Sequence, residues 1–299
     1  MATGQSRWRS AAIIAALLGS FSVGCAAKRS SGLTETVLEP PMHTTSQTLL
    51  AEAEAAWQER EDPDRLLEAI LLYKKIARSS AADREVLVRL SRALYFYADG
   101  YLKNDEERIR KYDQGTYYGE KALAQNQEFK ALIDSGTPVI EALDVLGEED
   151  CEALYWTAAN LGKWSKLKGI PTVLRNTALF KAMLEKADAL DDSYNYGGPP
   201  RTWGAYYAAA PSIVGGDLEK SRQYFERAME IAPDYFATRV LMAEIYAPKV
   251  HDRDLFVSLL TSVIEGDPYK LPDVVAEQKV EQAKARNLLA SVDQYFPEN

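Results

Sequence analysis

Residues 194–233 read YNYGGPPRTWGAYYAAAPSIVGGDLEKSRQYFERAMEIAP and carry the clearest helix signals of the chain. Phe225 and Ala228 lie on one helical face, and Pro233 then ends that helix. A large apolar residue fills the groove between two helices, whereas a small one lets them cross closely. Ala210–Asp217 (APSIVGGD) separates this helix from the preceding one. The stretch therefore predicts two packed helices with an insertion between them.

The pattern of this helix pair returns nearer the C-terminus. Phe225 and Pro233 stand 35 residues before Leu260 and Pro268. A tetratricopeptide (TPR) helix pair repeats at about 34 residues. Stacked helix pairs offer extended surfaces that recognise other molecules. The repeat thus indicates a binding scaffold.

Helical periodicity runs along most of the chain, and strand-like alternation is scarce. We expect an all-α fold, a TPR-like helix-pair array (α-solenoid) with a C-terminal capping helix, over residues 47–299. A long irregular connection is expected at 125–148. The expected pairs are 46–60 with 64–78, 82–98 with 105–124, 149–164 with 171–190, 199–209 with 217–231, and 234–246 with 252–265, followed by a charged closing helix at 273–295.

Helix boundaries are marked by prolines and aspartates. Prolines are tolerated in the first helical turn, because its N–H groups have no partner within the helix. An aspartate before a helix accepts hydrogen bonds from these N–H groups. The expected starts are at Pro171 and Pro199, and the expected N-caps are Asp217, Asp234, Asp252 and Asp273.

The first 25 residues predict export. Two arginines precede the apolar run AAIIAALL at 11–18, which is too short to span a bilayer but typical of a signal peptide. Residues 22–25 (SVGC) read as a lipobox, although Ser22 stands where a leucine is usual. We expect a lipoprotein signal peptide at 1–24 and a lipid on Cys25. The alternative is an ordinary cleaved signal with an incidental cysteine.

The segment after the cysteine has no helical period and is rich in Ser, Thr, Gly and Pro. We expect residues 25–46 to be the lipidated cysteine and a flexible tether that holds a periplasmic domain at the membrane through the lipid alone. Ala26 indicates sorting to the outer membrane. Without residues 1–24 the chain has 33 basic and 44 acidic residues, a net charge of −11. This charge disfavours nucleic acid as a partner.

The chain offers few residues for catalysis or metal binding. After lipidation Cys151 is the remaining cysteine, and the two histidines are His43 and His251. This composition disfavours disulfides, metal sites and histidine-based catalysis. No phosphate-binding glycine loop is present in the sequence. We expect a protein that is not an enzyme and has no metal or cofactor, although two carboxylates alone can hydrolyse glycosides.

Aromatic residues gather between residues 156 and 207. Tyr and Trp combine an apolar body with a polar tip, and Arg binds carboxylates with two donors. The simpler interpretation is that these rings fill gaps between helices, and for any single residue it is favoured. For the group together with Arg201, a binding surface for a partner or ligand is nearly as plausible. The candidate residues are Trp156, Asn160, Trp164, Tyr196, Arg201, Trp203, Tyr206 and Tyr207.

Five segments together resemble the T component of TPR-associated TRAP transporters. They are WTAANLGKW (156–164), the stretch 197–233, LMAEIYA (241–247), DRDLFVSLL (252–260) and QKVEQAKARNLL (278–289). The resemblance covers roughly residues 48–290, and its most specific element is Ala210–Asp217, which generic TPRs lack.

The resemblance implies a helical periplasmic lipoprotein that binds the solute-binding component of a TRAP-type transporter. It further implies a homotrimer and a cleft for a small organic or hydrophobic ligand. The alternative function is a TPR lipoprotein scaffold for envelope or outer-membrane-protein assembly, which would need no such cleft. The solute and the oligomeric state are not encoded in any motif of the chain.

Overall fold

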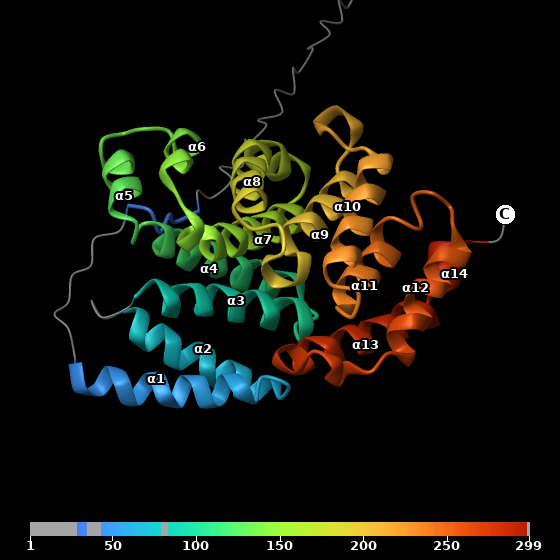
Figure 1. The fold of residues 1–299 in the computed structure, drawn as a ribbon, viewed down its shortest axis with the longest axis horizontal. Helices are drawn as coiled ribbons and strands as arrows, with labels where there is room; N and C mark the ends of the chain where they lie inside the picture. The colour runs from blue at the N-terminus through green and yellow to red at the C-terminus, as the bar shows by residue number, and fades with distance from the viewer. Residues whose placement is uncertain (1–28, 35–42, 79–82, 298–299) are drawn as a thin grey trace, which may run out of the picture.

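A computed structural model describes residues 29–34, 43–78 and 83–297. Within these ranges the chain forms fourteen α-helices and no strand, which confirms the predicted all-α class (Figure 1). The predicted signal peptide, 1–24, and the lipidation site, Cys25, lie outside these ranges. None of the described helices is long and apolar enough to cross a membrane.

The helices follow the sequence periodicity closely, with boundaries shifted by a few residues from the expected ones. Their bounds are α1 His43–Gln58, α2 Pro63–Ala77, α3 Arg84–Gly100, α4 Asp105–Leu123, α5 Gln127–Asp134, α6 Val139–Ala142, α7 Cys151–Lys168, α8 Ile170–Leu190, α9 Tyr194–Ala209, α10 Leu218–Ile231, α11 Phe236–Ile245, α12 Arg253–Glu265, α13 Val275–Ala290 and α14 Val292–Tyr295.

Successive helices pack as pairs. α1 packs on α2, α3 on α4, α7 on α8, α9 on α10 and α11 on α12, and α2–α3 and α4–α7 contacts join the first pairs. The connection 125–148, which was expected to be irregular, contains the short helices α5 and α6. Glycines allow the close crossing of α4 and α7. A Cβ on Gly115 would lie 2.3 Å from Asn160 Oδ1, and one on Gly119 would lie 2.2 Å from Thr157 Oγ1.

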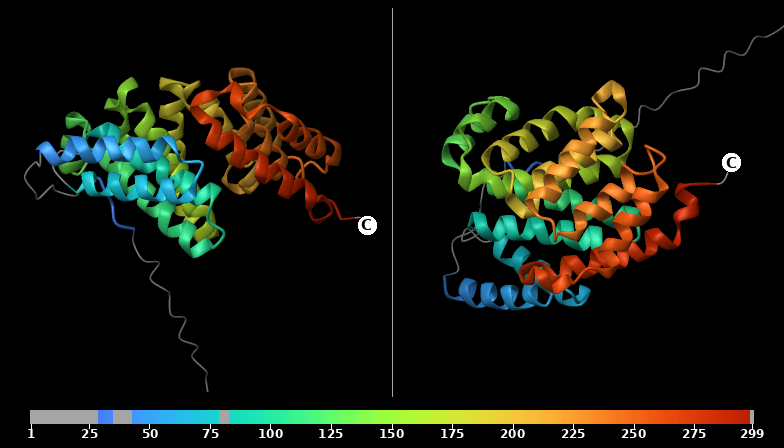
Figure 2. Two further views of the ribbon diagram at one scale, coloured as in Figure 1. Left: turned by 90° about the horizontal axis from the view of Figure 1, so that it is seen from below. Right: turned by 45° about the vertical axis from the view of Figure 1, so that its right-hand side comes forward.

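The apolar core is divided into two main clusters. The larger spans α1 to α9, and the smaller spans α9 to α13 with Phe225, Phe256 and Leu260 at its centre. Figure 2 shows the corresponding two groups of helices, with α9 between them. Helix α13 returns from the second group to the first, where it packs on α3. The expected closing helix thus joins the two ends of the array.

Two of the four expected aspartate caps are confirmed. Asp217 accepts from the N–H groups of Glu219 and Lys220, and Asp252 accepts from that of Leu255. The other two predictions were wrong: the carboxylate of Asp234 accepts from Lys270 at 3.0 Å, and Asp273 lies inside the 3-10 turn Pro272–Val274 that precedes α13. Helices α11 and α13 begin instead after Tyr235 and Val274.

A short segment within the expected tether lies against α4. Glu120 accepts hydrogen bonds from the backbone N–H of Gly32 at 2.8 Å and the hydroxyl of Ser31 at 3.2 Å, and it pairs with Arg29. Leu33 is buried in the larger core cluster. Residues 29–34 are therefore docked on the helical domain, and α1 already begins at His43, ahead of the expected domain boundary.

Cys151, at the start of α7, is buried. Its sulfur lies 3.6 Å from the carbonyl oxygen of Ala187. Burial, with a contribution from Asp191, raises the pKa of the thiol to about 12. The thiol is therefore protonated at neutral pH and packs as a small apolar group.

Candidate functional site: an aromatic and arginine-lined pocket

The start of α9 is a left-handed turn. Asn195, Tyr196 and Gly197 have φ angles of 49°, 59° and 69°, and the right-handed helix follows at the predicted start, Pro199. Such a conformation costs about 1 kcal/mol or more for a residue with a side chain, and strained residues of this kind cluster at functional sites. Gly197 also allows close approach, since a Cβ there would lie 3.1 Å from the Cα of Ala228.

Arg201 holds this turn. Its guanidinium donates hydrogen bonds to the carbonyl oxygens of Tyr196 at 2.9 Å and Asn195 at 3.2 Å, and to the hydroxyl of Tyr155 at 3.2 Å. The guanidinium carbon lies 4.8 Å from the ring centre of Tyr235. Arg201 is only 6% exposed, and no carboxylate among the described residues lies within ion-pair distance of it. The buried charge is balanced by carbonyl dipoles and aromatic faces.

An aromatic group connects Arg201 to α7. The indole N–H of Trp156 donates to the hydroxyl of Tyr194 at 2.7 Å. The ring of Tyr155 meets those of Trp156 and Tyr194 edge-on at 4.9 and 5.4 Å. Burial raises the pKa of Tyr194 and that of Tyr235. Both phenols therefore remain neutral at physiological pH.

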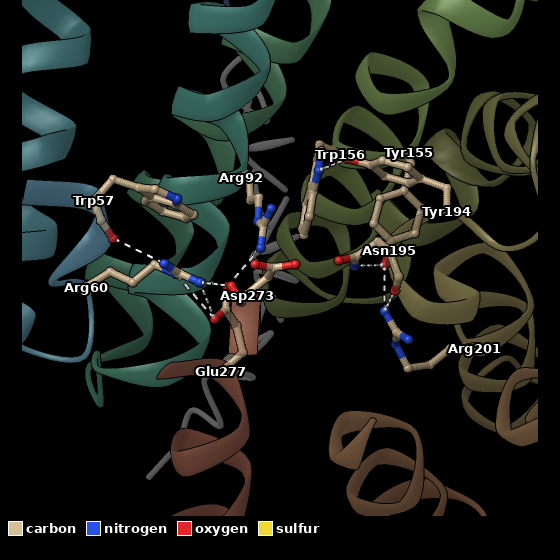
Figure 3. Close-up of polar contacts among 10 residues, drawn as sticks. All are labelled: Trp57, Arg60, Arg92, Tyr155, Trp156, Tyr194, Asn195, Arg201, Asp273 and Glu277. Atoms are coloured by element: carbon tan, nitrogen blue, oxygen red, sulfur yellow. Dashed lines mark hydrogen bonds and ion pairs between the residues drawn. The ribbon is translucent and has the colours of Figure 1, made fainter. Parts of the chain in front are cut away.

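Arg92 on α3 lies at the other end of this aromatic group (Figure 3). Its guanidinium is 5.2 Å from the ring centre of Trp57 and 5.8 Å from that of Trp156. It also donates to Glu277 of α13 at 2.9 Å. The same carboxylate accepts from Arg60 at 3.0 Å. Four helices that are distant in sequence, α1, α3, α7 and α13, thus contribute to one constellation.

A pocket of about 340 Å³ opens at this point between α3, α7 and the start of α9. Trp156, Tyr194 and Arg92 form part of its wall, and the acidic side chains of Glu85 and Glu152 are exposed. Four of its seven lining residues are charged and two are aromatic, so it is more polar than most small-molecule sites, which are lined mainly by apolar side chains with a few fixed polar groups. The complete lining is Glu85, Val88, Arg89, Arg92, Glu152, Trp156 and Tyr194.

Three of the predicted site residues meet around this constellation. Trp156 lines the pocket, Arg201 lies on the far side of the aromatic group, and Tyr196 stacks on Tyr235 with ring centres 4.8 Å apart. Their assignment to ligand binding stays a prediction. Sequence reasoning overlooked Arg92 and Glu277, since neither stands in a recognisable motif.

The other five predicted residues lie elsewhere. Trp203 stacks on Tyr207, which stacks on Tyr224 of α10, and Tyr206 packs against Phe180 of α8. Trp164 is half-buried against the larger core cluster. The amide of Asn160 is fully buried and donates to Ser91 and to the carbonyl oxygen of Trp156. These side chains join helices to one another.

The described residues contain no cluster of His, Cys, Asp or Glu side chains suited to a metal ion. The constellation presents aromatic surfaces and guanidinium donors.

Comparison with known proteins places the chain in a family. The family model described as TRAP transporter T-component matches residues 64–296. A protein of Treponema pallidum (strain Nichols), described as an uncharacterized protein, is 26% identical over 304 aligned positions, which cover 91% of this chain and 93% of that protein. Because the match extends over most of the helical array, the chain belongs to the TRAP transporter T-component family.

Proposed function

We propose that this protein is a periplasmic lipoprotein that binds the solute-binding component of a TRAP-type transporter and holds a small organic ligand in its pocket. The family match carries the proposal, since membership indicates association with a TRAP transporter. The pocket between α3, α7 and α9 supports the ligand-binding part. In this proposal the protein acts by binding, without catalysis or a cofactor.

The proposed anchor is a lipid on Cys25 in the outer membrane. Four residues beyond it, Arg29 pairs with Glu120 of α4. Four residues of chain reach at most about 14 Å. The anchor would therefore hold the α4 side of the domain close to the lipid headgroups, and the remaining surface would face the periplasm.

The insertion after α9 is the proposed docking surface for the solute-binding protein. Ile213 is 90% exposed there, and Leu218 beside it is also exposed. The loop is nevertheless fixed, because the hydroxyl of Tyr206 donates to the carbonyl oxygen of Val214 and the N–H of Gly216 donates to that of Pro211 at 3.1 Å. An exposed isoleucine on a fixed loop is suited to a partner surface.

Affinity capture tests this proposal. The mature protein would be immobilised and offered the purified solute-binding protein of a TRAP system from the same genome. We expect capture by the wild type, strong loss with Ile213→Asp, and no loss with Leu71→Asp, a matched change at an exposed leucine of α2. Absence of capture by the wild type would contradict the transport function and leave envelope assembly as the alternative.

A further inference from the structure

We propose that the α7–α8 turn, residues 166–175, is a membrane-contact surface that inserts Ile170 and Leu174 into a phospholipid layer with anionic headgroups. This inference rests on the lipid anchor of the proposed function and deepens it, since it states which part of the helical domain touches the lipid. It is carried by two exposed aliphatic side chains, by the charge around them and by the short length of chain that leads to the proposed anchor.

The α7–α8 turn exposes two large aliphatic side chains. Ile170 is 67% exposed and Leu174 is 52% exposed. They stand four residues apart at the start of α8, so they project from the same face of the helix. Single exposed aliphatic residues are common on protein surfaces, whereas neighbouring ones mark an interaction surface. The pair therefore indicates a partner, and the charge around it indicates the kind of partner.

The turn holds these side chains in a fixed position. Gly169 alone separates α7 from α8, and its φ of 94° is a conformation that favours glycine. Pro171 lies in the first turn of α8, where its ring suits the helical backbone. Across the turn, the amide of Asn176 donates to the hydroxyl oxygen of Ser165 at 3.2 Å. A surface that is already ordered loses little conformational entropy on contact.

The charge of this region is opposite to that of the whole chain. Residues 153–184 contain no aspartate or glutamate, although the chain has 44 of them, and they contain five lysines and arginines. Three of these cations flank Ile170 and are exposed, namely Lys166, Lys168 and Arg175. None of the three forms an ion pair within the part of the chain that the structure describes. Cations around an apolar pair suit an anionic phospholipid surface.

The proposed anchor lies on the same side of the domain as this turn. Arg29, four residues beyond Cys25, pairs with Glu120 and lies 3.6 Å from Asp113 of α4. Burial raises the pKa of Asp113, and the charges of Arg29 and Lys168 oppose this rise, so Lys168 lies near the same carboxylate. Four residues of chain reach at most about 14 Å. The lipid on Cys25 and the α7–α8 turn would therefore meet the same membrane surface.

A contact of this size would act together with the anchor. Two aliphatic side chains and three cations bind a bilayer weakly by themselves, but a tether keeps them at a high local concentration beside the headgroups. An acidic protein would offer the same charge, but the short chain to the anchor favours the membrane. The contact would set the orientation of the domain, whereas the lipid would supply its attachment.

Quenching of an introduced tryptophan by brominated lipid tests the contact. The unlipidated mature chain would be coupled through Cys25 to a maleimide lipid in vesicles of phosphatidylethanolamine and phosphatidylglycerol with brominated acyl chains. Cys151 does not compete, because burial raises the pKa of its thiol to about 12. We expect Ile170→Trp to lose most of the fluorescence that it gains over the wild type. Leu71→Trp, at a similarly exposed position of α2, should keep its added fluorescence.

Charge variants in the Ile170→Trp background test the lipid class. Lys168→Gln and Arg175→Gln should each lower the ratio of quenched to unquenched tryptophan about fivefold, the contribution expected of one cation near an anionic surface. Arg253→Gln, at an exposed pair with Asp293, is the matched control and should leave the ratio unchanged. Brominated phosphatidylcholine alone should quench less. Equal quenching by phosphatidylcholine would overturn the assignment to anionic lipid.

Three further results would contradict the inference. Quenching of Ile170→Trp no greater than that of the wild type would show that the turn does not touch lipid, and it would leave the proposed function intact. Loss of an oligomer in native mass spectra of Ile170→Asp would assign the turn to contacts between copies of the chain. An unmodified Cys25 in the mature protein from its host would contradict the proposed anchor and this inference together.

Discussion

Glu277 of α13 accepts a hydrogen bond from Arg60, just beyond the end of α1, at 3.0 Å, although 217 residues separate them. Lys284 and Lys279 of α13 pair in the same way with Asp99 at the end of α3 and with Glu61. Ion pairs thus make up much of the contact between α13, the last long helix, and the first two helix pairs. This closure brings Glu277 to Arg60 and to Arg92, the latter a residue that lines the pocket.

The Glu277 contact is expected to stabilise the closed array. Glu277→Gln leaves Arg60 and Arg92 without their shared carboxylate, and breaking a buried pair in this way typically costs about 3–5 kcal/mol. Urea denaturation measures the change in the free energy of unfolding. Glu61→Gln removes the exposed partner of Lys279, which lies on α13 as Glu277 does. This variant should lower the free energy of unfolding by about 0–1 kcal/mol. Equal effects of the two variants would show that closure does not depend on the buried pair.

Asp99 is expected to make stability depend on pH. Its carboxylate pairs with Lys163 and Lys284, each at 2.5 Å. Burial would raise the pKa of Asp99, but the two ammonium groups outweigh burial and hold it well below its usual range. With a folded pKa below the unfolded value of about 3.9, the carboxylate contributes full stability above pH 4 and loses it as pH falls toward the folded pKa.

Asp99→Asn should therefore be less stable than the wild type at pH 7, and the difference should shrink as the pH falls below about 4. Glu281 shares Lys284 with Asp99, and burial raises the pKa of Glu281, so the comparison is made in a Glu281→Gln background. Thermal unfolding from pH 3 to pH 7 measures the difference, with Glu226→Gln at an exposed pair as the control. A difference that does not change with pH would contradict the assigned ion pairs.

The crossing of α4 and α7 is expected to require glycine. In Gly119→Ala the new Cβ would lie 2.2 Å from Thr157 Oγ1 and 3.2 Å from its Cα, so the helices must separate. Overpacking of this kind costs about 1–3 kcal/mol. Gly147→Ala, where no atom lies within 4 Å of the added Cβ, should be neutral to within about 0.5 kcal/mol by urea denaturation. Equal stability of the two variants would be incompatible with this helix crossing.

The docked segment 29–34 is expected to protect Arg29 from trypsin. In Gly32→Ala the added Cβ would lie 2.2 Å from the carbonyl oxygen of Tyr117, so the segment cannot dock as in the wild type. Cleavage after Arg29 should become faster, as followed by mass spectrometry, while Thr34→Ala, at an exposed position, should behave as the wild type. Cleavage at the wild-type rate in Gly32→Ala would argue against docking.

Helix positions could be predicted because they are encoded locally, by periodicity and by caps such as Asp217 and Asp252. Asp234 failed as a cap because its carboxylate pairs with the distant Lys270, and Asp273 failed because it lies inside the 3-10 turn Pro272–Val274, so that α13 begins only at Val275. The site residues likewise divide into those with a local sequence signal and those placed by distant contacts. Trp156, Tyr196 and Arg201 could be predicted as site residues from the local concentration of aromatic residues. Arg92 and Glu277 could not, because they meet only when α13 packs on α3, and no sequence motif predicts that contact.

The central claim, association with a TRAP-type solute-binding protein, is tested most directly by native mass spectrometry of the mature protein, purified without refolding and mixed with that partner. We predict a complex of defined stoichiometry, with the protein itself present as the homotrimer that the family resemblance implies, and loss of this complex in Ile213→Asp. Two species that remain separate at concentrations well above the micromolar range would contradict the claim.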